Sequence, residues 1–272
     1  MTDHYAVIGH PIAHSKSPDI HAAFARECGE DIQYERLLAP PTGFAETVEA
    51  FRKSGALGAN VTLPFKVEAF GYASETTARA KRGGSVNTLR FESDKIVGDN
   101  TDGVGLCRDI VRNLGVPLLG ARILLIGAGG AARAVAGALL DCQPDALAIT
   151  NRTHHKAQAI VDEIGAGKLF SAVKPAELPM RRFDVLINAT SASLTASLAP
   201  IPVTCFGNNA LAYDMMYGLG LTPFLALAAG ADARTADGLG MLVEQAAEAF
   251  YVWRGVRPST GPVIAMLKQP IP

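Results

Sequence analysis

Residues 122–140 of this 272-residue chain are RILLIGAGGAARAVAGALL, which predicts an apolar strand, a glycine-rich turn and an alanine-rich helix. Gly127, Gly129 and Ala132 fit G-x-G-x-x-A, whose small residues let the backbone approach a pyrophosphate at a helix N-terminus. A glycine turn without a ligand is the alternative, but the flanking strand and helix favour a dinucleotide site. The residues of this predicted site are Gly127, Ala128, Gly129, Gly130, Ala131 and Ala132.

The next predicted strand ends in Asn151, Arg152 and Thr153. NAD enzymes often carry an acidic residue here, about 20 residues past the glycines, that binds the ribose hydroxyls. This chain has no acid there, so Arg152, helped by Thr153 and Lys156, is expected to pair with the 2′-phosphate of NADP. A solvated surface arginine is the alternative, and the missing acid makes it second choice.

Short apolar runs alternate with helical stretches along the whole chain, which predicts two α/β domains with largely parallel sheets. We expect a substrate-binding and catalytic domain at 1–101, joined by the C-terminal helical segment 240–272. A Rossmann NADP-binding domain is expected at 102–239, with a cleft between the two domains. Strands are predicted at 5–9, 34–38, 58–63, 86–91, 95–100, 122–128, 146–152, 183–189 and 210–217, and helices at 17–28, 44–55, 64–73, 103–114 and 239–254.

The composition is that of a globular protein, with 49% apolar residues, 19% charged residues and a net charge of −1. Nothing indicates a nucleic-acid or membrane partner. The N-terminus MTDHYAVIGHPIAHSKSP lacks a basic segment followed by a long apolar run, so no signal peptide is expected. The four cysteines form no C-x-x-C, which favours reduced thiols in a cytoplasmic protein and predicts no metal site.

Two segments, NVTLPFK at 60–66 and DNTDGVG at 99–105, place a charged side chain where a strand gives way to a helix. Lys66 is expected in the first turn of a helix opened by Pro64, and Asp102 at the N-cap of the helix over 103–114. With a redox cofactor site, the pair suggests alcohol oxidation or ketone reduction, and the sequence does not assign the proton to either residue. The alternative is an ion pair that only joins the two domains.

The N-terminal half also contains polar residues suited to a carboxylate or a polyol. Ser17 is predicted to be the N-cap of a helix, with Ser15 on the loop before it, and two hydroxyls beside a helix N-terminus suit a carboxylate. Read alone, Ser17 is more simply a helix cap. Asn60 and Thr62 alternate along a strand and would face the same way, and Asn87 lies at the start of another strand.

Taken together, these segments resemble the shikimate dehydrogenase family over essentially the whole chain. The resemblance implies reversible NADPH-linked reduction of 3-dehydroshikimate to shikimate in aromatic amino-acid biosynthesis. It also implies a small-molecule substrate and a monomer or homodimer. The matching motifs, in chain order, are GHPIAHSKSPDIH, NVTLPFK, GGSVNT, GDNTDGVG, GAGGAAR, NRT, INATS, DMMYGLGLTPFL and DGLGMLVEQAAEAF.

The resemblance also implies a role for each residue. Ser15 and Ser17 would hold the substrate carboxylate, Tyr217 would help to close the site, and Met215 and Gly238 would lie near the nicotinamide. Without the flanking motifs, Met215 would be interpreted as core packing and Gln245 as an exposed helix residue. The residues that would hold the ring hydroxyls are Asn60, Thr62, Lys66, Asn87, Asp102 and Gln245.

Three positions depart from the family pattern. Ser193 stands where a glycine is usual, and Ala22 where asparagine is frequent. The segment Gly218-Leu219-Gly220 replaces a frequent proline and suggests a looser loop. If the backbone at Ser193 needs a positive φ, serine is unfavourable there and the cofactor-side loop is displaced.

Two other functions remain open. A quinate or quinate/shikimate dehydrogenase would share the fold and most motifs. An NAD preference, with an acid near the end of the second Rossmann strand, would favour this function, and the segment NRT at that place argues against it. An NADP-sensing regulator need not keep both Lys66 and Asp102, so their joint presence counts against that function.

Overall fold

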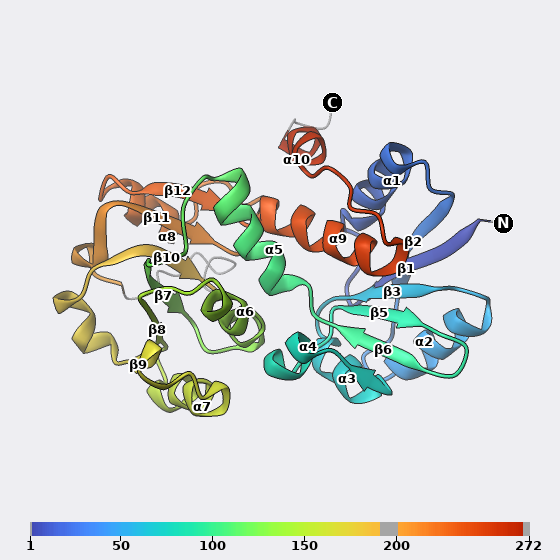
Figure 1. Cartoon of the computed structure of the whole chain (residues 1–272), viewed down its shortest axis with the longest axis horizontal. Coiled ribbons are helices and arrows are strands. Elements are labelled where there is room, and N and C mark those ends of the chain that lie inside the picture. Colours follow the sequence, from blue (N-terminus) through green and yellow to red (C-terminus); the bar gives the residue numbers. More distant parts are fainter. Residues whose placement is uncertain (1, 191–200, 269–272) are drawn as a thin grey trace. The chain divides into compact units, whose positions relative to one another are not determined.

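The structure is a computed structural model that describes residues 2–190 and 201–268, and it divides into two compact units (Figure 1). Unit 1 comprises Met1–Gly105 with Leu242–Pro272, and unit 2 comprises Leu106–Met241. The division falls inside helix α5 (Asp102–Arg108) and inside helix α9 (Leu239–Arg254), whereas the sequence placed its boundaries at the starts of these helices. Each helix therefore contributes residues to both units.

The sheet of unit 1 has the strand order β2-β1-β3-β5-β6-β4. β1 is parallel to β2 and β3, and β4 is parallel to β6, while β5 is antiparallel to both of its neighbours. The exception arises because a short turn joins β5 to β6, and such a turn produces an antiparallel hairpin. The strands are β1 (Asp3–Gly9), β2 (Ile32–Leu38), β3 (Gly58–Val61), β4 (Glu75–Thr76), β5 (Thr88–Phe91) and β6 (Ile96–Asp99).

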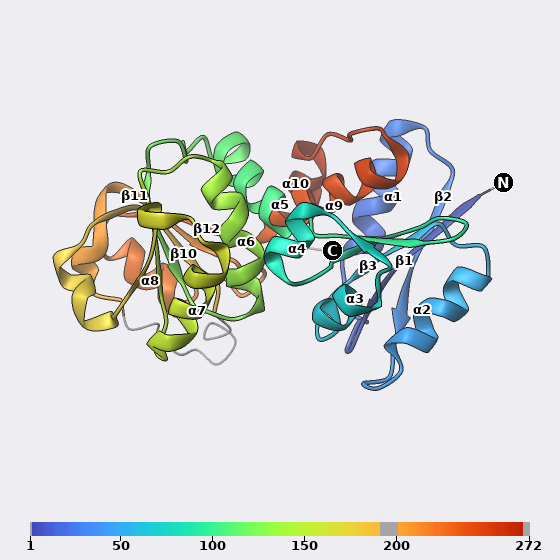
Figure 2. The same cartoon turned by 60° about the horizontal axis from the view of Figure 1, so that its bottom comes forward.

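Helices cover both faces of this sheet, as Figures 1 and 2 show. Alternate residues of β1 face opposite sides: Ala6 and Ile8 pack in one core cluster with Phe44 of α2, whereas the Tyr5 ring stacks on Trp253 of α9. The other helices of unit 1 are α1 (Ser17–Cys28), α2 (Phe44–Lys53), α3 (Lys66–Tyr72), α4 (Ala78–Gly83) and α10 (Gly261–Lys268).

The sheet of unit 2 is entirely parallel, in the order β12-β11-β10-β7-β8-β9. This is the doubly wound Rossmann order, and it confirms the predicted two-domain α/β fold class. Ile123 and Leu125 of β7 pack in one core cluster, while Leu124 and Ile126 pack in another, so both faces are buried. The strands are β7 (Arg122–Ile126), β8 (Ala146–Thr150), β9 (Phe170–Val173), β10 (Phe183–Asn188), β11 (Phe206–Asp214) and β12 (Arg234–Asp237), and the helices include α6 (Gly130–Asp141), α7 (His154–Ile164) and α8 (Pro223–Ala229).

Helix α5 differs from the continuous helix predicted over 103–114. It begins at Asp102 rather than after it, and beyond Arg108 the chain forms a π-helical turn at Asp109–Asn113. The wider turn accompanies the buried carboxylate of Asp109, which accepts hydrogen bonds from the Tyr213 hydroxyl (2.7 Å) and the Asn113 amide (2.9 Å).

Across residues 2–190 and 201–268, no helix combines the length and apolar character needed to cross a membrane.

Candidate active site

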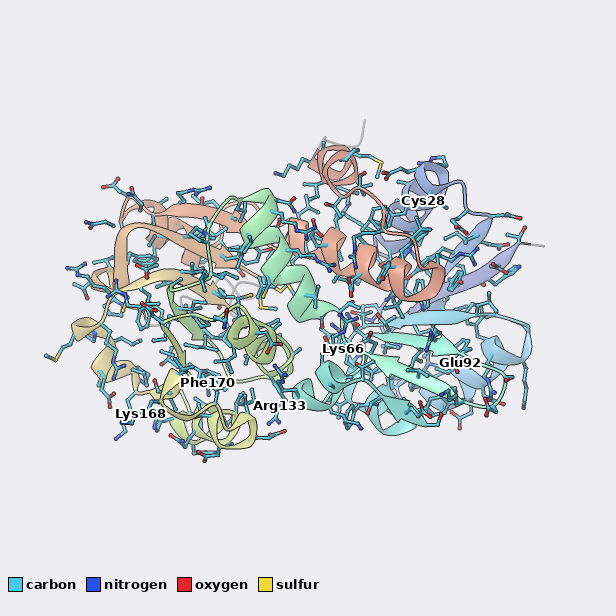
Figure 3. The ribbon with its side chains drawn as sticks, in the orientation of Figure 1. Cys28, Lys66, Glu92, Arg133, Lys168 and Phe170 are labelled. Carbon is cyan, nitrogen blue, oxygen red and sulfur yellow. The ribbon has the colours of Figure 1, made fainter. Side chains whose placement is uncertain are left out.

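Lys66 and Asp102 form an ion pair in unit 1, with Lys66 Nζ 2.6 Å from Asp102 Oδ2 (Figure 3 labels Lys66). α3 begins at Lys66, with Phe65 at its N-cap, so the helix starts two residues after Pro64, where the sequence predicted its start. Asp102 is the first residue of α5, and its backbone N–H donates to Asn100 Oδ1 (3.1 Å). The lysine side chain is 27% exposed and the aspartate 10%, so Lys66 is the member of the pair that a ligand can reach.

Asn87 connects this pair to helix α9. Its Nδ2 lies 2.9 Å from Asp102 Oδ1 and 3.2 Å from Gln245 Oε1, and its Oδ1 accepts from the backbone N–H of Thr101 (2.9 Å). Asn87 immediately precedes β5 and Asp102 follows β6, so the antiparallel pairing of these strands brings the two residues together. A Cβ at Gly105 would lie 2.7 Å from the backbone nitrogen of Gln245, so glycine permits α5 to approach α9.

Asn60 lies on β3, next to Asn87. Its Nδ2 donates to the backbone oxygen of Asn87 and to Thr88 Oγ1 (both 3.1 Å), and its Oδ1 accepts from the Tyr34 hydroxyl (2.7 Å). Both amide hydrogens therefore serve the protein, and the amide oxygen is the acceptor of this side chain. Thr62 follows β3, which ends at Val61 rather than at residue 63 as predicted, and is partly exposed.

The two serines lie at the start of α1, with a correction to the predicted cap. Lys16, not Ser17, occupies the N-cap position, and Ser17 is the first helical residue. Ser15 Oγ accepts the backbone N–H of Ser17 (3.3 Å) and donates to Ser17 Oγ (3.2 Å). Ser15 thus supplies the oxygen that the sequence predicted for Ser17, because the chain enters the helix one residue earlier.

The predicted dinucleotide turn follows β7 in unit 2. Gly127 has φ = 108°, and a Cβ there would lie 2.9 Å from Thr190 Cγ2, so this position requires glycine. α6 begins at Gly130, and its N-cap, Gly129, provides no side-chain hydrogen bond. Apart from the adjacent residues and the backbone of α6 itself, no described atom lies within 4 Å of a Cβ built at Gly129 or Gly130. The first N–H groups of a helix have no partner within the helix, so the start of α6 is suited to a phosphate.

The neighbouring strand β8 ends at Thr150, and Asn151 Nδ2 donates to the backbone oxygen of Thr153 (3.0 Å) across the following turn. Thr153 is the N-cap of α7 and makes no side-chain cap bond, and the first turn of α7 contains no acid. Arg152 and Lys156 are both exposed. Helix N-termini normally favour acids, so this group of cations is suited to an anion.

Met215, Tyr217 and Gly238 follow the carboxyl ends of the adjacent strands β11 and β12. A Cβ at Gly238 would lie 2.2 Å from the backbone oxygen of Met215, so glycine allows these two loops to approach. Burial raises the pKa of the Tyr217 hydroxyl. The strand predicted to reach residue 217 ends at Asp214, which places Met215 and Tyr217 in the loop.

Several site residues were not predicted from the sequence. Tyr34 of β2 contacts Asn60, and Thr101 and Asn100 support Asn87 and Asp102. Asn100 and Thr101 lie in the segment DNTDGVG, so this motif could have indicated them. Tyr34 lies in no motif, and nothing in the sequence around it indicated a role. Ser193 lies outside the described residues. Among the described residues, no group of three or more His, Cys, Asp or Glu is arranged to hold a metal ion.

The parallel sheet, glycine turn and cationic helix start of unit 2 are those of a dinucleotide-binding domain, and unit 1 carries the Lys66–Asp102 pair. This combination defines a two-domain NAD(P)-dependent oxidoreductase. Three family models match: the shikimate dehydrogenase substrate binding domain at residues 7–89, shikimate / quinate 5-dehydrogenase at 110–197, and the shikimate 5′-dehydrogenase C-terminal domain at 238–268. The chain belongs to the shikimate dehydrogenase family.

Relatives and solved structures agree with this assignment. The chain is 57% identical over 271 residues to the shikimate dehydrogenase (NADP(+)) of Nitrosospira multiformis, covering 98% of each. An Ael1 enzyme from Pseudomonas putida is 47% identical, with a TM-score of 0.96 and complete coverage of both chains (100%). Shikimate 5-dehydrogenase from Thermus thermophilus, solved with NADP(H) and shikimate, is 32% identical, with a TM-score of 0.87 over 97% of this chain and 98% of that one.

Proposed function

We propose that this chain is an NADP-dependent shikimate dehydrogenase that reduces 3-dehydroshikimate to shikimate and catalyses the reverse reaction. The observation that carries the proposal is the Lys66–Asp102 pair at 2.6 Å, which Asn87 links to Gln245 in a family of known chemistry. The reaction belongs to the biosynthesis of chorismate and the aromatic amino acids. The four cysteines are free thiols, which supports a cytoplasmic location, and we expect a monomer or homodimer.

The cofactor site follows from unit 2. The turn Gly127–Ala132 would hold the pyrophosphate, because the open helix start of α6 and its glycines leave backbone N–H groups free to donate. Asn151, Arg152, Thr153 and Lys156 would hold the adenosine ribose and its 2′-phosphate. Met215 and Gly238 would lie near the nicotinamide. NADPH bound at these residues would supply the reducing equivalent for the ketone.

The substrate site follows from unit 1. Ser15 and Ser17 would hold the carboxylate, and Tyr217 would help to close the site. Because both amide hydrogens of Asn60 are in use, we propose that its amide oxygen accepts a hydrogen bond from a ring hydroxyl. The other residues proposed to hold the ring hydroxyls are Thr62, Lys66, Asn87, Asp102 and Gln245.

Lys66 performs the proton transfer in this proposal. Negative charge develops on the C3 oxygen during reduction, and the more exposed Lys66 ammonium donates a proton or hydrogen bond to it. Asp102 orients the lysine through the 2.6 Å contact, and Asn87 in turn fixes the second carboxylate oxygen. In the oxidative direction, Lys66 accepts the proton of the substrate hydroxyl.

The test is absorbance at the reduced-nicotinamide band, with shikimate or quinate offered against NADP or NAD. We expect the highest specificity constant for shikimate with NADP. Binding of NADP without turnover of either acid would contradict the proposal and support a cofactor-sensing regulator.

We predict that quinate is at best a poor substrate, with a specificity constant at least about tenfold below that of shikimate. Shikimate has a flat carbon beside its carboxylate, whereas quinate has a tetrahedral carbon bearing a hydroxyl. Two serine hydroxyls held 3.2 Å apart at the start of α1 would be misaligned with the displaced carboxylate. Comparable specificity constants under NADP would instead support a dual quinate/shikimate dehydrogenase.

A further inference from the structure

Arg36 of β2 contacts the loop that carries the two serines. Its Nε and Nη2 both donate to the backbone oxygen of Ser15, at 2.8 and 2.5 Å. The guanidinium is thereby attached to the same residue whose hydroxyl lies beside Ser17. One arginine fixes the peptide group of Ser15 and brings a permanent positive charge to this loop.

The strand register places Arg36 on the site's face of the sheet. Val7 of β1 is paired with Arg36 on one side and with Asn60 on the other, so these two residues lie at the same level of the sheet. Tyr34, two residues before Arg36, faces the same side because side chains alternate along a strand, and its hydroxyl contacts Asn60. Arg36 therefore continues the row of polar residues toward Ser15.

We propose that Arg36 is a positioning residue for the substrate carboxylate: it holds the Ser15 loop and its charge attracts the acid group. This inference rests on the proposed function, because it requires that Ser15 and Ser17 receive a carboxylate. A carbonyl oxygen at the surface could bind water equally well, so a charged partner is not needed to satisfy it. A positive charge beside a carboxylate-binding site lowers the free energy of the bound anion.

Asp19, in the first turn of α1, is the acidic group that competes for this charge. Its Oδ2 lies 3.8 Å from Arg36 Nη2, farther than the carbonyl oxygen of Ser15, and its side chain is 66% exposed. Solvent screens such an exposed pair strongly, so Asp19 neutralises the guanidinium only weakly. The charge of Arg36 remains available to an anion held by the serines.

The test compares Arg36→Gln, which keeps a donor but loses the charge, with Arg36→Lys, which keeps the charge. Arg36→Gln should raise KM for shikimate about five- to twentyfold, the effect of a partly exposed charge-assisted contact, with kcat within about twofold. Arg36→Lys should recover most of the affinity. KM for NADP should be unchanged in both variants, because the cofactor residues lie in unit 2.

Shikimate methyl ester distinguishes a charge effect from a merely structural one, because its acid group is neutral. The KM increase of Arg36→Gln should largely disappear with the ester. The control variant Arg26→Gln, which alters an exposed arginine of α1, should leave KM unchanged for both the acid and the ester. An equal increase for acid and ester, or no increase for the acid, would overturn the inference. Failure of the wild-type protein to oxidise shikimate would instead overturn the proposed function.

Discussion

The two units build their sites from different parts of the chain. In unit 1 the site consists of side chains that are hydrogen-bonded to one another. The single side chain of Asn87, for example, contacts Asp102, Thr101 and Gln245. In unit 2 the dinucleotide turn consists of backbone, and its glycines matter for what they lack. Chemistry in unit 1 is therefore expected to depend on the identity of side chains, whereas binding in unit 2 is expected to depend on backbone shape and a few surface charges.

The largest expected effect tests the chemical half of this contrast. Lys66→Ala should lower kcat about 10²- to 10⁴-fold with a smaller change in KM, because the lysine acts on charge formed in the transition state. Steady-state kinetics at saturating NADP measures both constants. Lys53→Ala is the control, because this exposed lysine of α2 pairs only at the surface with Glu49 (3.4 Å) and should leave turnover unchanged. Retention of turnover within a fewfold, with only affinity impaired, would show that Lys66 is a binding residue.

The second effect tests the binding half. Arg152→Asp should lower kcat/KM with NADP about 10- to 100-fold and spare NAD, because a charge-assisted contact to the 2′-phosphate contributes about 1.5–3 kcal/mol. Arg181→Asp is a suitable control, because this residue pairs with Glu177 at 3.9 Å and lies outside the proposed cofactor site. Equal losses with both cofactors would mean that Arg152 does not recognise the phosphate.

The smallest effect concerns the buried support of unit 1. His21 of α1 is fully buried, and its ring stacks on Tyr34 at 4.2 Å. Burial lowers its pKa from 6.5 to about 3. The folded state therefore keeps the neutral form, while the unfolded chain binds a proton below pH 6.5, so stability is lost as the pH falls from 6.5 toward 3.

Between pH 6.5 and pH 5, His21 should lower the free energy of unfolding by about 1.5 kcal/mol, because the slope rises from half to nearly all of about 1.36 kcal/mol per pH unit over this range. Urea unfolding of the wild type and of His21→Phe at both pH values measures this loss. The variant should show a smaller decrease, because phenylalanine keeps a stacked ring but does not titrate. Parallel decreases in the two proteins would show that His21 is not the group responsible.

Much of this architecture could be predicted because it is local in sequence. The segment RILLIGAGGAARAV contains its strand, turn and helix within one run, and Lys66 and Asp102 each follow a short apolar strand. Arg36 and Tyr34 could not be found this way, because their partners Ser15 and Asn60 come from segments distant in sequence that only the folded chain brings near. The prediction of Ser17 as N-cap was wrong, because the pair Ser17-Pro18 fits a helix that begins at Pro18 and also one that begins at Ser17.

The division of the chain inside α5 and α9 has a consequence for how the protein is made. Unit 2 is a continuous segment, whereas unit 1 needs Leu242–Pro272 as well as Met1–Gly105. Because a ribosome releases the N-terminus first, unit 2 has all its residues before unit 1 does. Gln245 of α9 is synthesised after the last residue of unit 2. All residues of the dinucleotide fold are therefore available before Asn87 can contact Gln245, its partner on α9.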